Sequence, residues 1–188
     1  MRKMQVNWEG KTKLTLSLLL LVFAGVVAGI TGVILVATAM LASSIGDYSI
    51  MKSRGVFGDK KDKKYFARGV IAFAVAHLLY IFAMQGTKWW GNIVVLDIIC
   101  CLLTIIMAVK RDKFGDMMNV PYAACLILAA INGWQFHWLA GIGYVQFIIS
   151  DLILAIGEDR DPKYQIPIWA TYVPGQACII ASVLVKTM

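Results

Sequence analysis

The sequence has 188 residues, is 60% hydrophobic and has a mean hydropathy of +0.73. This composition leaves too little polar surface to cover a soluble domain, so it excludes water-soluble enzymes and binding modules. The formal net charge of +7 does not indicate a nucleic acid partner, because the basic residues lie in short segments between long apolar runs.

We predict an all-α, polytopic transmembrane helix bundle. A helix needs about 20 apolar residues to cross roughly 30 Å of hydrocarbon, and such runs recur along the chain. The first begins at Leu14, and no small-residue cleavage pattern follows it, so it is interpreted as a span and not as a signal peptide. Residues 1–188 are expected to form a single transmembrane helical domain. About seven spans are predicted, at residues 13–28, 31–51, 66–84, 91–109, 118–133, 138–157 and 165–186.

The boundary between the first two spans depends on glycines and on charge. Residues 13–51 would make one helix of about 58 Å, far longer than a bilayer is thick, and Gly25, Gly29 and Gly32 offer a turn. With two spans and a cytoplasmic N-terminus, 16 of the 18 Lys and Arg residues lie on the cytoplasmic side, against 12 for a single span. The positive-inside rule therefore favours seven spans, with the C-terminus outside.

The tryptophans and cysteines are expected to have structural roles. Four tryptophans are expected at the outer ends of helices as interfacial anchors: Trp89, Trp90, Trp134 and Trp138. The cysteines lie inside apolar runs without CxxC spacing, so they are expected to be packing residues: Cys100, Cys101, Cys125 and Cys178.

Three aspartates lie inside predicted spans. A carboxylate in hydrocarbon costs at least about 2.5 to 3.5 kcal/mol, so each is a functional candidate unless a partner or the interface explains it. Asp47 and Asp151 lie at a similar depth, roughly 8 to 9 Å from the cytoplasmic ends of their spans, which suggests a shared cavity. The alternative is that each only joins helices through hydrogen bonds. Asp97 lies near the outer end of its span and is expected to be a satisfied structural acid apart from the other two.

Residues at regular helical spacing form one face of the third span, called the patterned face below. Spacings of 3, 4, 4 and 3 place five residues on one side of the helix: Phe66, Gly69, Phe73, His77 and Tyr80. This face is consistent with core packing alone. However, a histidine at mid-membrane needs polar partners or water, so we expect His77 to face the same interior as the acids.

Further polar residues lie at positions that would complete a cavity. Three serines lie within one turn of the acids, and two residues of the last span are stacked at i and i+4: Ser43, Ser44 and Ser150, with Tyr172 and Gln176. We expect no metal and no cofactor, because a catalytic zinc site takes three protein ligands and the chain has only His77 in a span and His137 in an outer loop. No GxSxG motif supports a serine hydrolase.

Four segments resemble signatures of the YhhN or lysoplasmalogenase family. Residues 43–48 (SSIGDY) are similar to its S-x-x-G-D signature, and the patterned face of the third span is similar to F-x-x-G-x-x-x-F-x-x-x-H-x-x-Y. Residues 150–155 (SDLILA) and 172–176 (YVPGQ) resemble S-D-x-x-L-A and Y-x-x-G-[HQ]. The segments follow the family's order and extend from residue 43 to residue 176.

The resemblance implies a membrane hydrolase that cleaves the vinyl ether bond of lysoplasmalogens to a fatty aldehyde and a glycerophospho-base. Family members commonly have eight spans, so a chain of seven is expected to lack the first, which bears on substrate choice and activity. Proton transfer to carbon starts this hydrolysis, and a pair of carboxyl groups can act as acid and base. Asp47 and Asp151 are the expected pair, with neither role assigned, and His77 and Tyr80 are expected to orient a carboxyl group, water or substrate.

The expected partners are a lysophospholipid substrate and membrane lipids, in a bacterial cell membrane. Substrate-binding roles are expected for five residues: Tyr80, Ser43, Ser150, Tyr172 and Gln176. The basic segment 52–68 is expected either to attract the headgroup or only to set the topology. Two alternatives stay open, a small proton-coupled transporter or channel that uses the same Asp and His residues, and a non-catalytic lipid-binding protein.

Overall fold

The computed structural model describes residues 2–53, 63–84, 90–110, 113, 115–156 and 164–188. Within these ranges, seven long helices and one short 3-10 turn account for nearly every residue, which confirms the all-α fold class. In chain order they are α1 (Arg2–Thr31), α2 (Ile34–Ser53), α3 (Lys63–Ala83), α4 (Trp90–Val109), η1 (Gly115–Met118), α6 (Asn119–Phe136), α7 (Trp138–Ile156) and α8 (Gln165–Thr187).

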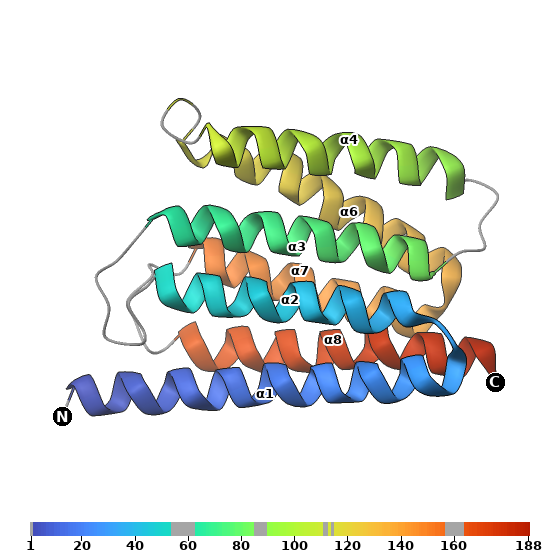
Figure 1. The fold of residues 1–188 in the computed structure, drawn as a ribbon, viewed down its shortest axis with the longest axis horizontal. Helices are drawn as coiled ribbons and strands as arrows, with labels where there is room; N and C mark the ends of the chain where they lie inside the picture. The colour runs from blue at the N-terminus through green and yellow to red at the C-terminus, as the bar shows by residue number, and fades with distance from the viewer. Residues whose placement is uncertain (1, 54–62, 85–89, 111–112, 114, 157–163) are drawn as a thin grey trace.

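Six of the described helices are long and apolar enough to cross a membrane, namely α1, α2, α3, α4, α7 and α8. The shorter α6 also runs along the bundle (Figure 1), and its polar residues Asn119, Asn132 and Gln135 make it less apolar. The chain is a polytopic membrane protein whose N- and C-termini lie at opposite ends (Figure 1). The end where α1 begins is called the cytoplasmic end below, as the charge distribution predicts, and the other is called the outer end.

The turn between α1 and α2 confirms two separate helices and corrects their predicted boundary. Gly32 has a φ of 74°, a left-handed conformation that favours glycine and commonly ends a helix. Its N–H bonds the carbonyl of Ala28 at 2.9 Å, and the Thr31 hydroxyl accepts the Val33 N–H at 3.2 Å. Gly25 and Gly29 remain inside α1, so the first helix ends at Thr31 instead of residue 28.

Six helices form a closed ring, and α4 lies outside it. Each of α1, α2, α3, α6, α7 and α8 packs against the next, and α8 returns to α1. The remaining helix α4 packs on α3 and α6 at one edge of the molecule (Figure 1). The patterned face of α3 points inward as predicted, since Gly69, His77 and Tyr80 are buried.

Glycines set the closest approaches between helices. A Cβ atom built on Gly143 of α7 would lie 2.6 Å from the carbonyl oxygen of Gly175 in α8, and one on Gly175 would lie 2.9 Å from that of Gly143. On α2, a Cβ on Gly46 would meet the Phe73 ring at 2.8 Å, and one on Gly69 of α3 would meet Ile50 at 2.7 Å. Small residues of this kind let helices pack tightly in a membrane, where association lacks a hydrophobic driving force.

The structure describes the side chains of two of the four predicted anchor tryptophans and of all four cysteines. Trp134 and Trp138 are 51% and 59% exposed near the outer end, as an interfacial role requires. Trp89 and the side chain of Trp90 lie outside the described residues. The four cysteines lie within helices as free thiols that form no disulfide bond, and Cys101 and Cys125 are buried.

Candidate functional site

A pocket of about 50 Å³ lies at the cytoplasmic end of the bundle, lined by residues of α1, α2, α3, α7 and α8. It has room for a few water molecules, each of which needs about 10 to 15 Å³. Four residues that the sequence singled out line this pocket: Asp47, Asp151, Ser150 and Tyr172. The two acids come from different helices, Asp47 from α2 and Asp151 from α7. The structure therefore brings them together in one cavity.

Asp47 is held by hydroxyl groups from two other helices. It lies on α2, is 6% exposed, and its Oδ2 accepts hydrogen bonds from Ser17 of α1 at 2.7 Å and from Tyr172 of α8 at 2.9 Å. Ser17 Oγ also lies 3.0 Å from Ser44 Oγ, one turn before Asp47. Asp47 thus ties α1, α2 and α8 together at the pocket wall.

The hydrogen bonds continue from Tyr172 toward the middle of the bundle. Gln176 Nε2 lies 3.5 Å from the Tyr172 hydroxyl and donates to Ser43 Oγ at 3.3 Å. Its Oε1 accepts a hydrogen bond from the Tyr80 hydroxyl at 3.0 Å. Tyr80, Ser43 and Gln176 do not line the pocket; they form a buried network behind Tyr172.

Asp151 accepts a hydrogen bond from a different helix. It lies on α7, where its Oδ2 accepts a hydrogen bond of 2.6 Å from the hydroxyl of Tyr122 on α6. The preceding residue, Ser150, is 2% exposed and also lines the pocket. Asp47 therefore accepts two hydroxyl donors on one oxygen, whereas Asp151 accepts one.

His77 is buried among aromatic rings and does not bond either acid. Its ring centroid lies 4.9 Å from that of Phe147, 5.9 Å from that of Tyr144 and 6.0 Å from that of Tyr122. Neither ring nitrogen has a hydrogen-bond partner within the described part of the chain. The expectation that His77 faces the polar interior is thus only partly met, because it reaches Asp151 only through its contact with Tyr122.

Phe73 lies one turn before His77 on the same helix. Its ring lies edge-on to Phe147 of α7, with centroids 6.0 Å apart, and to Tyr172 of α8 at 6.4 Å. Phe73 also lines the pocket. The patterned face of α3 therefore contributes a ring to the pocket wall and a histidine to the layer behind it.

Asp97 departs from its prediction as a satisfied acid. Its side chain is fully buried on α4, and neither carboxyl oxygen has a hydrogen-bond partner among the described residues. Asn132 of α6 and the hydroxyl of Tyr144 of α7 are also buried without such partners. Asp97 does not line the pocket, which agrees with its predicted separation from the other acids.

Four residues of the site were missed at the level of sequence: Lys13, Ser17, Tyr122 and Trp169. A signal existed for the first two, because the buried residues Lys13, Ser17, Leu20, Ala24 and Val27 follow helical spacing on one face of α1. In the sequence analysis, Lys13 contributes only to the number of basic residues on the cytoplasmic side. Tyr122 and Trp169 have no comparable signal, since aromatic residues near helix ends are common at interfaces.

Part of the basic segment 52–68 is described. Lys52 Nζ lies 4.5 Å from the centroid of the Tyr65 ring, and the Arg68 guanidinium carbon lies 4.9 Å from it. These are cation–π contacts. Residues 54–62 lie outside the described residues, and none of the described residues of this segment lines the pocket. Over the described ranges, no three His, Cys, Asp or Glu side chains gather in a way that could hold a metal ion.

One comparison with known proteins gives a match. The profile of the YhhN family matches residues 7–183, which is nearly the whole chain. No curated protein and no solved structure matches the chain.

Proposed function

The chain belongs to the YhhN family, which includes lysoplasmalogenases, and on this premise we propose that it hydrolyses the vinyl ether bond of lysoplasmalogens. The products are a fatty aldehyde and a glycerophospho-base. One observation carries the proposal: Asp47 and Asp151, from helices about a hundred residues apart in sequence, line one pocket with room for water.

The first step needs an acid. Asp151 donates its proton to the alkene carbon remote from the ether oxygen, and the π electrons form the new C–H bond. The positive charge that results is shared by the neighbouring carbon and the ether oxygen. We assign the ionised role to Asp47 because its Oδ2 accepts two hydrogen bonds, and its negative charge stabilises the cation.

The later steps need water and return both acids to their starting states. A water molecule in the pocket adds to the cationic carbon and gives a proton to Asp47, which forms a hemiacetal. The hemiacetal hydroxyl then gives its proton to Asp151, the C–O bond to glycerol breaks, and the leaving oxygen takes the proton from Asp47. The net reaction adds one water and restores the initial protonation of both residues.

Some of the other predicted residues line the pocket beside the two acids, and the rest lie behind the pocket wall. Ser150 and Tyr172 line the pocket, which supports the proposal that they contact the substrate. Tyr80, Ser43 and Gln176 form the hydrogen bonds behind Tyr172, so we now propose that they position Asp47 instead of binding substrate. We propose that His77 positions Tyr122, against which its ring packs, and through it Asp151.

The substrate enters from the lipid phase of a bacterial cell membrane. The pocket is too small for a whole lysolipid, so only the reacting end occupies it. The alkenyl chain lies between apolar helices, and the headgroup remains near the cytoplasmic end. Ile50, Leu154 and Ile168 of the pocket wall provide the apolar surface that such a chain needs.

The test replaces each acid by its neutral amide in the purified protein. Asp47→Asn and Asp151→Asn should each reduce aldehyde release from a lysoplasmalogen by about 100-fold or more, the usual contribution of an acid or base. The matched control is Asp97→Asn, a buried acid outside the pocket, which should retain activity. Full activity in either pocket variant would remove that residue from the mechanism. Absence of aldehyde with the native protein would contradict the proposed function.

A specific observation supports proton-coupled transport as the second candidate. Asp97, Asn132, Tyr144 and His77 are buried polar residues with atoms that lack partners among the described residues, and ionisable residues of this kind mark proton pathways in transporters. Proton flux into liposomes that contain the protein, without aldehyde release, would favour transport. Binding of lysolipid with neither flux nor turnover would favour a non-catalytic lipid-binding protein.

A further inference from the structure

Lys13 is a buried cation in the wall of the pocket that holds the two acids. Its side chain is 9% exposed on α1, and its ammonium donates a hydrogen bond to Oε1 of Gln165, the first residue of α8. The ammonium nitrogen also lies 5.9 Å from the centroid of the Trp169 ring. Lys13, Gln165 and Trp169 all line the pocket. The positive charge of Lys13 therefore lies in the wall of the same pocket as the two acids.

The cation and the acids lie at different depths. Lys13 precedes Ser17 by four residues on α1, so it lies about one turn, or 6 Å, closer to the cytoplasmic end than the residue that bonds Asp47. On α8, Gln165 precedes Tyr172 by seven residues, or about 10 Å. The pocket thus has a cation at its cytoplasmic side, called the mouth below, and acids deeper in the bundle, called the interior.

We propose that Lys13 binds the phosphate of the lysophospholipid headgroup and thereby selects phosphate-bearing substrates. This inference rests on the proposed function. In a lysoplasmalogen, the short glycerol backbone separates the vinyl ether from the phosphate, which matches acids in the interior and an ammonium at the mouth. The ammonium, the Gln165 amide and the indole N–H of Trp169 supply donors for phosphate oxygens.

The charge pattern also fixes the orientation of the substrate. A phosphate in the interior would face the ionised carboxylate of Asp47, and like charges at short distance in a low dielectric repel strongly. At the mouth, it meets the ammonium of Lys13 instead. The same separation keeps the vinyl ether between the two acids, so Lys13 is a specificity-determining residue and takes no part in proton transfer.

The test compares two substrates that differ only in the phosphate. One is a 1-alkenyl glycerophosphoethanolamine, and the other is the matching 1-alkenylglycerol. Lys13→Gln should raise KM for the first by about 10- to 100-fold, the usual effect of a lost charged hydrogen bond, with KM for the second unchanged. Lys13→Arg should keep the preference, because it keeps the charge. The ratio between substrates does not depend on the fraction of protein that is folded.

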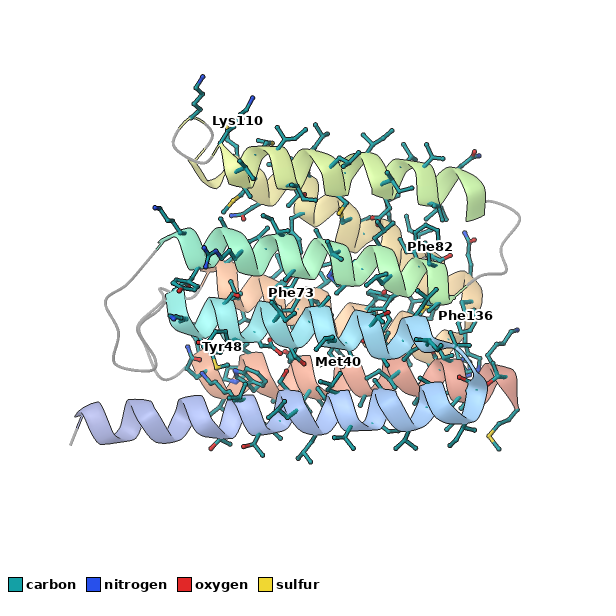
Figure 2. The ribbon with its side chains drawn as sticks, viewed as in Figure 1. Met40, Tyr48, Phe73, Phe82, Lys110 and Phe136 are labelled. Atoms are coloured by element: carbon teal, nitrogen blue, oxygen red, sulfur yellow. The ribbon has the colours of Figure 1, made fainter. Side chains whose placement is uncertain are left out.

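Lys110→Gln is the matched control. Lys110 is an exposed lysine at the cytoplasmic end of α4 and extends away from the bundle (Figure 2). It should leave both KM values unchanged. Equal effects of Lys13→Gln on the two substrates, or no effect on either, would overturn the proposal. An equal loss of preference in Lys110→Gln would also overturn it, because general surface charge would then be the cause.

A binding measurement separates this inference from the proposed function. Saturated 1-alkyl analogues of both substrates lack the vinyl ether and are not cleaved by this mechanism. The phosphate-bearing analogue should bind the native protein and lose about 10- to 100-fold in affinity with Lys13→Gln, whereas inorganic phosphate alone should not compete at equal concentration. Competition by phosphate at that concentration would indicate an anion site without lipid selectivity and would contradict the proposal. If the native protein released no aldehyde, this measurement would still decide the role of Lys13.

Discussion

At the residue scale, the two acids of the pocket differ in their hydroxyl donors. Among the described residues, Asp47 accepts two donors on Oδ2, from Ser17 and Tyr172, whereas Asp151 accepts the Tyr122 hydroxyl alone. More donors stabilise a carboxylate in its charged form, so the unequal supply of donors supports the proposed assignment of Asp47 as base and Asp151 as acid. Tyr122 is the donor whose removal tests this division most directly.

Tyr122→Phe should lower kcat for aldehyde release by about 10- to 100-fold, because it removes a hydrogen bond worth about 1.5 to 3 kcal/mol to a charged or reacting carboxyl group. The ring that packs against His77 is retained. Tyr144→Phe is the matched control, since the Tyr144 hydroxyl is buried without a partner among the described residues. Steady-state kinetics of the two variants check the prediction. Equal losses in both would indicate that the Tyr122 hydroxyl has no special role.

At the element scale, glycines determine which helices approach closely enough to form the site. Gly143 and Gly175 bring the backbones of α7 and α8 into contact, and Gly46 admits the Phe73 ring of α3 against α2. Gly46 lies next to Asp47, and Gly175 next to Gln176. The segments that resemble the family signatures thus combine a polar side chain with the glycine that permits close packing beside it. Any residue larger than glycine should separate the helices and disturb the pocket.

Gly143→Ala and Gly175→Ala should each lower the Tm of the purified protein, with a cost of about 1 to 3 kcal/mol for overpacking. Gly29→Ala on α1 is the matched control, because a Cβ there meets nothing within 4 Å; its Tm should be unchanged or slightly higher. Thermal unfolding in detergent checks the three variants. Since the two glycines contact each other, the double variant should lose less than the sum of the single losses. Strict additivity would contradict a shared contact.

At the scale of the whole molecule, the seven long helices of the described residues alternate in direction along the chain and place the two termini at opposite ends of the bundle (Figure 1). The pocket lies at the end where α1 begins, which the distribution of Lys and Arg assigns to the cytoplasm. The headgroup of a bound lysolipid would therefore face the cytoplasmic surface. This orientation can be measured without any assay of activity.

Cysteine labelling in intact cells should report opposite sides for the two ends of the molecule. Lys186→Cys, at the exposed outer end of α8, should react with a membrane-impermeant maleimide added outside. Lys110→Cys, at the exposed cytoplasmic end of α4, should react only after permeabilisation. The native cysteines lie inside helices, so the unmodified protein provides the background. The reverse pattern would show that the bundle is inverted and that the pocket faces outward.

Much of the fold follows from the sequence by itself. The length and spacing of the apolar runs predicted the seven helices, because a helix that crosses hydrocarbon must bond its backbone internally and needs about 20 residues to do so. Helical periodicity predicted the inward face of α3, and depth along each helix placed Asp47 and Asp151 at one level. Helix length, periodicity and depth can each be calculated from a single segment of the chain. The end of α1 was misplaced because three glycines offered a turn and only Gly32 adopts the required φ.

Only the tertiary structure decided which segments meet around the acids. Ser17 and Tyr172 lie 30 and 125 residues from Asp47 in sequence, and Tyr122 lies 29 residues from Asp151. Because lipid is as apolar as the helices, burial of apolar surface cannot select their neighbours; glycine contacts and hydrogen bonds between helices do so. The same packing placed Lys13 at the pocket and surrounded His77 with aromatic rings. Periodicity along a single helix contains no information about these contacts between distant segments.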